Sequence, residues 1–205
     1  MGEKGFPPGF LARADPTPDP WFYRPPRLVT HIDDAAIAAV GALYAELGLG
    51  GEVLDLMSSW VSHFVTAPRR LVGLGMNAAE LSANPMLAGH VVHDLNAEPT
   101  LPFADRSFDD VTCCVSVDYL VRPVEVFREV ARVLRPGGRF VVTFSNRCFP
   151  SKAIRGWLAT DDAGRQRIVG SYFELAGGFE PAQSQRRTSP GRGDPLFGVW
   201  ARRSA

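Results

Sequence analysis

Two acids, Asp55 and Asp94, each follow a short apolar segment and stand where a buried strand would end. Ligands of open α/β sheets bind beyond the carboxyl ends of the strands, so both acids are placed to accept hydrogen bonds from a ligand. The turn after the first such strand is normally rich in glycine, which lets the backbone approach the ligand closely. In this chain the six residues after Asp55 are Leu, Met, Ser, Ser, Trp and Val. The sequence therefore indicates a nucleotide-type site whose first turn is built in an unusual way.

The elements that must position these acids alternate along residues 33–205. The apolar patterns predict a mostly parallel α/β sheet with helices on both faces, because its strands are Val-rich and follow helices. Asp33 or Asp34 is expected to cap the first helix, and serines to begin the second. The expected strands are 52–56, 70–75, 90–95, 109–117, 139–145 and 195–203, and the expected helices are 33–47, 58–64, 77–84, 122–134 and 162–178.

The leading segment, residues 1–32, has a different character from the domain of residues 33–205. Its seven prolines exclude a long helix or a central strand. The stretch PWFYRPPRLV, residues 20–29, is nevertheless apolar and aromatic, so we expect it to pack across the domain. Two interpretations follow: a lid that closes over the ligand site, or a structural strap that covers an apolar groove.

Composition narrows the classes of partner. The formal net charge is zero, which gives no electrostatic case for nucleic acid. The three cysteines lack the spacing of metal ligands, and no segment has the length and apolar character of a membrane span or signal peptide. We therefore expect a cytoplasmic protein without metal, nucleic-acid or membrane partners. The sequence does not indicate an oligomeric state.

Residues 91–146, VVHDLNAEPTLPFADRSFDDVTCCVSVDYLVRPVEVFREVARVLRPGGRFVVTFSN, carry a specific pattern. An acid, the block LPF…SFD, a strand and a helix ending in LRPGG follow one another. This pattern resembles the second half of class I S-adenosylmethionine-dependent methyltransferases of the small-molecule, type 11-like group, and the resemblance extends back to Glu52. It implies a Rossmann-like, mostly parallel seven-stranded sheet. It also implies S-adenosylmethionine as methyl donor, S-adenosylhomocysteine as product and a small-molecule acceptor.

The resemblance assigns roles to individual positions. Asp55 corresponds to the acid at the methionine end of the cofactor, and Asp94 and the Leu95 N–H to the groups that hold adenine. Ser116 and Val117 correspond to the strand end beside the sulfonium. The complete set of expected cofactor-binding residues is Arg27, Asp55, Met57, Ser58, Ser59, Gly75, Met76, Asn77, Asp94, Leu95, Ser116 and Val117.

Two positions depart from the family pattern. Glycines expected at alternate positions of the first turn are Met57, Ser59 and Val61, and the acid expected to hold the ribose hydroxyls is Gly75. We interpret the site as rebuilt: the serines at a helix start and Asn77 would replace the lost contacts, with Arg27 on the methionine carboxylate. The alternative is that Ser58, Ser59 and Asn77 merely cap helices.

Methyl transfer needs a protein base only when the acceptor holds its proton strongly. An insertion over residues 146–164 is expected to wall the acceptor pocket with Phe149, Ile154 and Trp157. The main hypothesis is a small-molecule methyltransferase. The alternatives are a non-catalytic module that binds a nucleoside-type ligand or a protein, and, less favoured because GxGxxG is absent, a nicotinamide-dependent oxidoreductase. The candidate catalytic residues are Tyr23, His31, Asp118 and Asn146.

Overall fold

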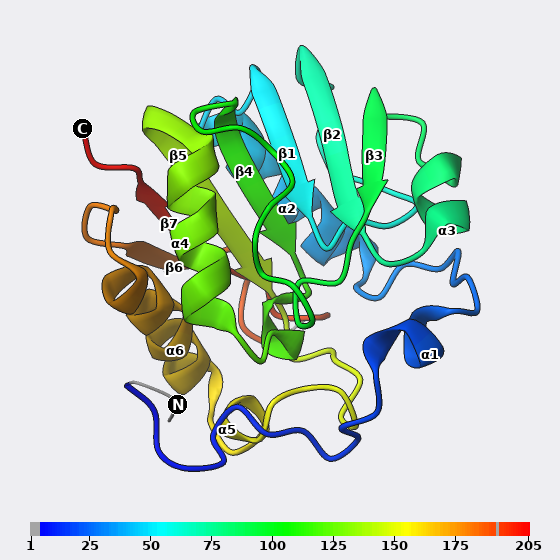
Figure 1. Cartoon of the computed structure of the whole chain (residues 1–205), viewed down its shortest axis with the longest axis vertical. Coiled ribbons are helices and arrows are strands. Elements are labelled where there is room, and N and C mark those ends of the chain that lie inside the picture. The colour runs from blue at the N-terminus through cyan, green and yellow to red at the C-terminus, as the bar shows by residue number, and fades with distance from the viewer. Residues whose placement is uncertain (1–4, 192) are drawn as a thin grey trace.

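The computed structural model of the protein describes residues 5–191 and 193–205, which form a seven-stranded sheet in the order β3-β2-β1-β4-β5-β7-β6 (Figure 1). The first five strands are parallel, while β7 runs antiparallel to both β5 and β6. This topology confirms the expected mostly parallel sheet. The strands are β1 Glu52–Leu56, β2 Arg70–Gly75, β3 Gly89–Val92, β4 Phe108–Cys114, β5 Leu134–Phe144, β6 Gln183–Arg186 and β7 Phe197–Arg202.

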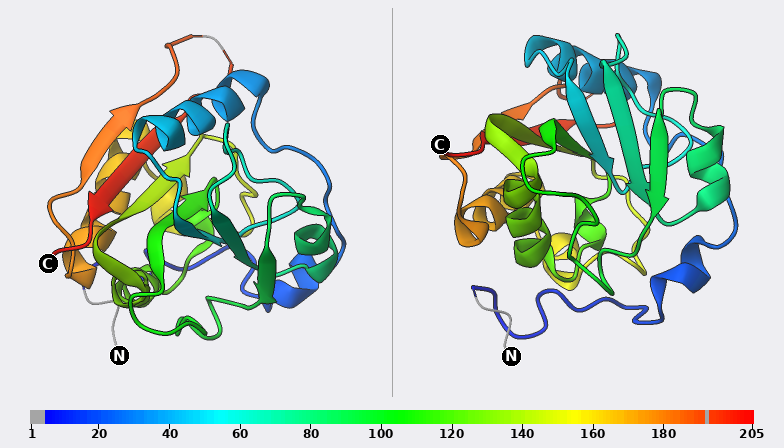
Figure 2. Two further views of the ribbon diagram at one scale, coloured as in Figure 1. Left: turned by 90° about the horizontal axis from the view of Figure 1, so that it is seen from above. Right: turned by 45° about the horizontal axis from the view of Figure 1, so that its top comes forward.

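Helices cover both faces of this sheet, as predicted. Helix α2 lies on one face, and α4 and α6 pack together on the other (Figure 2). A hydrophobic core lies on each face of the sheet, and successive side chains of β1 point to opposite cores. Val53 packs with α2, whereas Leu54 and Leu56 face the side of α4 and α6. The helices are α1 Asp19–Tyr23, α2 Asp34–Glu46, α3 Ala78–Ala83, α4 Pro123–Val133, α5 Arg155–Leu158 and α6 Asp162–Ala176, with a 3₁₀ turn at Val117–Tyr119.

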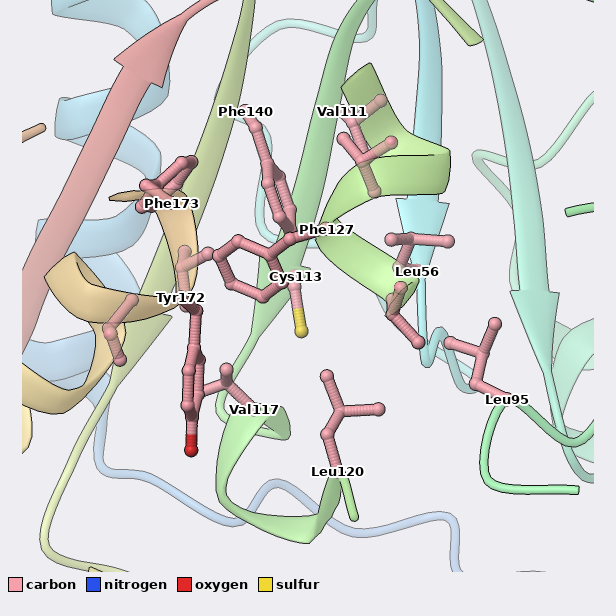
Figure 3. Packing of buried hydrophobic residues seen from close by; sticks show 14 of the residues in the cluster. Leu56, Leu95, Val111, Cys113, Val117, Leu120, Phe127, Phe140, Tyr172 and Phe173 are labelled. Atoms are coloured by element: carbon pink, nitrogen blue, oxygen red, sulfur yellow. The ribbon is translucent and has the colours of Figure 1, made fainter. Parts of the chain in front are cut away.

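The larger core is built largely from aromatic side chains. Phe127 of α4 packs edge-on against Phe140 of β5 and against Tyr172 and Phe173 of α6 (Figure 3). Helix α4 presents apolar side chains at helical spacing toward the sheet, which explains why the sequence pattern located it well. This core fixes the carboxyl ends of β1 and β4 in place.

Three parts of the secondary structure differ from expectation. Residues 58–64 form no helix; the chain there is an irregular loop. The short helices α1 and α5 and the edge strand β6 were not predicted, because each is too brief to show a periodic pattern. The expected helix 122–134 ends one residue early at Val133, and the RPGG that follows it belongs to β5.

The leading segment is held against the domain by buried charges. The ammonium of Lys152, which is fully buried, lies 3.1 Å from Asp15 and 3.3 Å from Asp19, and donates to the Thr17 carbonyl at 2.8 Å. Arg13 pairs with the same Asp19 at 2.7 Å. Buried ionic groups tolerate burial only when they are paired. Residues 13–19 of the segment are therefore fixed to the domain, whereas Trp21, Leu28 and Val29, which were expected to pack on it, are exposed.

We expect Lys152→Met to lower the free energy of unfolding by about 3 kcal/mol or more, because it leaves buried Asp19 with one cation fewer. Denaturant titration measures this change. The control is Arg69→Met, which removes ion pairs of a side chain that is 67% exposed and should cost about 0.5 kcal/mol or less. Equal losses in the two variants would contradict the anchoring role of Lys152.

Candidate functional site

A cavity of about 560 Å³ opens at the carboxyl ends of the parallel strands, where β1 separates β2 from β4. The volume suits a ligand the size of a nucleotide cofactor. Loops after β1, β2, β3, β4 and β5 line it together with the leading segment. The predicted site residues that line it are Tyr23, Arg27, His31, Asp55, Met57, Ser58, Ser59, Gly75, Met76, Asn77, Asp94, Leu95, Ser116 and Asn146.

The Asp55 carboxylate at the end of β1 is 5% exposed and accepts three hydroxyl hydrogen bonds. Ser58 and Ser62 donate to its Oδ2 at 2.8 Å each, and Thr112 of β4 donates to its Oδ1 at 2.7 Å. Burial raises the pKa of Asp55, and these bonds act in the opposite direction. The expectation that Ser58 begins a helix is therefore wrong: its hydroxyl faces Asp55, and the acid anchors the loop.

The loop after β1 crosses in front of β2. The Ser58 N–H donates to the Leu74 carbonyl at 2.9 Å, and Asn84 donates to the Ser59 carbonyl at 3.0 Å. A Cβ atom at Gly75 would overlap the Ser58 carbonyl oxygen. The path of this loop thus accounts for the missing acid, because the loop occupies the space that an acid at residue 75 would need.

One of the substituted glycine positions still has glycine-like backbone. Met57 adopts φ 54°, in the left-handed region that costs a non-glycine residue roughly 1–2 kcal/mol. Val115, which lines the cavity after β4, has φ 44°, an outlier for a β-branched residue. Strain of this kind persists only where surrounding contacts fix the backbone, and both residues lie at the cavity.

Asn77 caps α3 and has its side chain fully occupied. Its Oδ1 accepts from the Ala79 and Glu80 N–H groups, and its amide donates to the Tyr23 and Arg24 carbonyls. The side chain thus connects α3 to the leading segment. These contacts leave Asn77 without the spare amide group that the predicted ribose contact would require.

Sequence reasoning missed Glu80, which follows Asn77 by three residues. Its Oε1 accepts the Arg27 N–H at 2.7 Å, and its Oε2 accepts the Ser59 hydroxyl at 2.6 Å. The carboxylate lines the cavity and joins α3, the leading segment and the loop after β1. The spacing of Asn77 and Glu80 matches that of a helix capping box, so the sequence signal at Glu80 is one that usually indicates a structural role.

The turn after β3 holds Asp94 with one oxygen engaged. Its Oδ1 accepts the Asn96 and Ala97 N–H groups at 2.9 and 3.2 Å, whereas Oδ2 accepts no hydrogen bond from the described residues. Asn96 in turn donates to Asp19 and to the Tyr119 carbonyl. The Oδ2 atom of Asp94 can therefore accept a hydrogen bond from a ligand at the carboxyl end of β3.

An aromatic wall, defined as Phe22, Tyr23, His31, Tyr119 and Phe149, lies at one side of the site, and all of these residues except Phe22 line the cavity. Its rings contact one another edge-on or tilted, with centroids 4.9–6.5 Å apart. Burial is the main cause of a lowered pKa at His31 and of a raised pKa at Tyr23. His31 is consequently a neutral imidazole near pH 7, and Tyr23 remains a protonated phenol.

Arg27 lies over this wall. Its guanidinium carbon is 4.7 Å from the Phe22 ring centroid and 5.4 Å from that of Phe149, and one nitrogen donates to the Phe22 carbonyl at 2.9 Å. Arg27 forms no ion pair among the described residues. Its remaining N–H donors are available to an anionic group in the cavity.

Two predicted residues do not line the cavity. Val117 is fully buried and points into the core beside Leu120 and Tyr172 (Figure 3). Asp118 is 2% exposed, and its Oδ2 has no hydrogen-bond partner among the described residues. Both belong to a 3₁₀ turn that directs them away from the site.

Two residues expected to wall the acceptor pocket also lie outside the cavity. Ile154 and Trp157 are core residues, so of the expected insertion wall only Phe149 reaches the cavity. Burial raises the pKa of the Cys114 and Cys148 thiols, which disfavours a nucleophilic thiolate. The described residues contain no cluster of potential metal ligands. None of their helices has the length and apolar character to cross a membrane.

Comparison with known proteins places this geometry in context. Residues 45–142 match the family model described as Methyltransferase domain. A demethylmenaquinone methyltransferase of Mycobacterium sp. (strain JLS) is 38% identical over 110 residues, 50% of this chain and 47% of that protein. A ubiquinone biosynthesis O-methyltransferase of Xanthomonas oryzae pv. oryzae (strain PXO99A) is 30% identical over 117 residues, 55% and 47% of the two chains. The chain thus spans about half the length of these relatives.

Solved structures show the same fold. The 1,6-didemethyltoxoflavin-N1-methyltransferase of Burkholderia thailandensis, determined with S-adenosylhomocysteine, superposes with a TM-score of 0.61 over 84% of this chain and 79% of that one, at 18% identity. An S-adenosylmethionine-dependent methyltransferase of Mesorhizobium loti gives 0.54 over 79% and 96%, also at 18% identity. These similarities confirm the Rossmann-like fold expected from the sequence.

The burial of Asp118 makes stability depend on pH. Burial raises its pKa from 3.8 to about 7, so the folded protein binds this proton more tightly than the unfolded chain does. Stability due to this group is complete below pH 4 and falls as pH rises to 7, by about 1.4 kcal/mol per pH unit. We expect Asp118→Asn to remove this decline in denaturant unfolding measured at several pH values. Parallel curves for the two proteins would contradict it.

Proposed function

We propose that this chain transfers a methyl group from S-adenosylmethionine to a small acceptor, because its residues 45–142 match the family model described as Methyltransferase domain. The observation that carries this proposal is the cavity at the carboxyl ends of β1, β2 and β3, which unites nearly all the residues assigned from the family pattern. The bound sulfonium would supply an activated methyl group. The protein supplies the alignment of the two reactants, which contributes much of the rate.

The cavity offers suitable partners for the cofactor. Asp94 has an unused carboxylate oxygen for an adenine amino group, beside the buried side chain of Leu95. Arg27 has N–H donors left for the methionine carboxylate, a task suited to a planar guanidinium. Asp55 would act indirectly, by holding the loop of residues 57–64 in shape, since three hydroxyls already occupy its oxygens.

The aromatic wall favours an acceptor with a planar ring. Aromatic side chains bind such rings by stacking and edge contacts. The relatives named for demethylmenaquinone and for ubiquinone biosynthesis support an acceptor of this class. Neutral His31 would accept the proton of the acceptor, and Tyr23 and Asn146 would orient it through hydrogen bonds. Asp118 has no place in this scheme, because it does not reach the cavity.

A second candidate function is a non-catalytic module that binds a nucleoside-type ligand. This candidate is favoured because three hydroxyl groups already donate to Asp55, so this acid is not available to contact a ligand directly. The methyltransferase requires an adenosyl ligand in the cavity, whereas the module would accept a nucleoside-type ligand in general. They differ in whether methyl transfer follows, so turnover with ring-hydroxylated acceptors separates them.

We expect the protein to bind S-adenosylhomocysteine with a dissociation constant in roughly the micromolar range. Arg27→Ala should weaken binding about tenfold, because it removes the cation that faces the carboxylate. Isothermal titration calorimetry measures both constants, and Arg128→Ala on α4 serves as a control remote from the cavity. The absence of heat at millimolar ligand would refute the methyltransferase function and favour the non-catalytic module.

A pH profile tests the role of His31. The lowered pKa of this imidazole keeps it in the basic form below pH 6.5, so the acidic limb of kcat/KM should fall below that pH. His31→Gln should lower kcat and abolish this limb. His90→Gln, on the exposed face of β3 and outside the cavity, should leave the profile unchanged. An unaltered limb in His31→Gln would exclude His31 as the base.

A further inference from the structure

Four carboxylates line the cavity, and they differ in how far ion pairs and hydrogen bonds already occupy their oxygens. Asp19 is paired with Arg13 and Lys152, and Asp55 is enclosed by three hydroxyls. Asp94 stands after β3. Glu80 is half-buried, forms no ion pair among the described residues, and accepts one hydrogen bond on each oxygen. Each of its oxygens therefore has a second lone pair for a donor in the cavity.

The position of Glu80 is tied to the space lost at Gly75. The Ser58 carbonyl fills the volume that a side chain at Gly75 would need, and the next residue, Ser59, donates its hydroxyl to Glu80. The carboxylate thus lies beside the obstruction, on the first turn of the helix that follows β2. A carboxylate cannot extend from the end of β2, but one reaches the same region from α3.

The nearest alternative, Asn77, is excluded by its contacts. Its oxygen caps α3 and its amide donates to two carbonyls of the leading segment. A pair of adjacent hydroxyls requires acceptors, and a carboxylate presents two of them at a fixed separation. Among the groups on this side of the cavity, Glu80 has that chemistry.

We propose that the Glu80 carboxylate binds the two adjacent ribose hydroxyls of the adenosyl ligand, an assignment that rests on the proposed function. The Arg27 N–H and the Ser59 hydroxyl fix the orientation of the carboxylate before the ligand binds. Glu80 is a binding residue in this scheme and takes no part in methyl transfer. Through these two hydrogen bonds, the leading segment and the loop after β1 both position Glu80 for the ribose.

The test compares two ligands in calorimetric titrations of the full chain: S-adenosylhomocysteine and its 2′,3′-dideoxy analogue. The wild-type protein should bind S-adenosylhomocysteine, which carries the diol, at least tenfold more tightly than the dideoxy analogue. Glu80→Gln keeps the shape of the side chain and an oxygen acceptor. It should weaken the binding of S-adenosylhomocysteine about tenfold and change the binding of the dideoxy analogue little. The control, Glu125→Gln, changes a first-turn glutamate of α4 outside the cavity and should alter neither affinity.

Distinct results would overturn the assignment. A wild-type ratio near one would exclude a diol contact, and this measurement requires no variant. Equal weakening of both ligands by Glu80→Gln would show that the glutamate only supports the loop. If the wild type binds neither ligand, the proposed function fails as well. Binding of S-adenosylhomocysteine with an unchanged ratio in Glu80→Gln would overturn the role of Glu80 alone.

Discussion

The buried carboxylate of Asp55 determines how the ligand side of the sheet is arranged. A carboxylate at this depth is costly unless hydrogen bonds surround it, and hydroxyls from β4 and from the following loop provide them. Ser58 and Ser62 can both reach Oδ2 only if the chain turns back over the end of β1. One acid therefore dictates the path of the loop, and the loop dictates which neighbouring groups can meet a ligand.

The effects of that path extend across the cavity. With the Ser58 carbonyl against Gly75, the end of β2 carries no acid, and the carboxylates on this side of the cavity come from α3 and the turn after β3. Glu80 stands where these parts meet, since it accepts from Ser59 and from the Arg27 backbone. The arrangement is a connected hydrogen-bond network, so a change in one part alters the others.

Sequence reasoning located the sheet and the longer helices, because periodic apolar patterns reflect burial directly. It failed at residues 58–64, where serine hydroxyls resembled helix caps but found a buried acid as partner. Such a preference depends on three-dimensional proximity, as the Thr112 bond to Asp55 across 57 residues illustrates. Val117 and Asp118 were misplaced for a related reason, since a brief 3₁₀ turn reverses their direction without a sequence signal.

The buried pairing of Lys152 with Asp15 and Asp19 has a consequence for biosynthesis. Lys152 lies far from these partners in the sequence: it is 135 positions from Thr17, which stands between Asp15 and Asp19. The aromatic leading segment leaves the ribosome before Lys152 does, and its docking site is complete only after β5 and the residues beyond it have emerged. Until then Phe22 and Tyr23, which are partly buried in the folded protein, remain exposed on a nascent chain. This interval is when the chain is most open to chaperones and to aggregation.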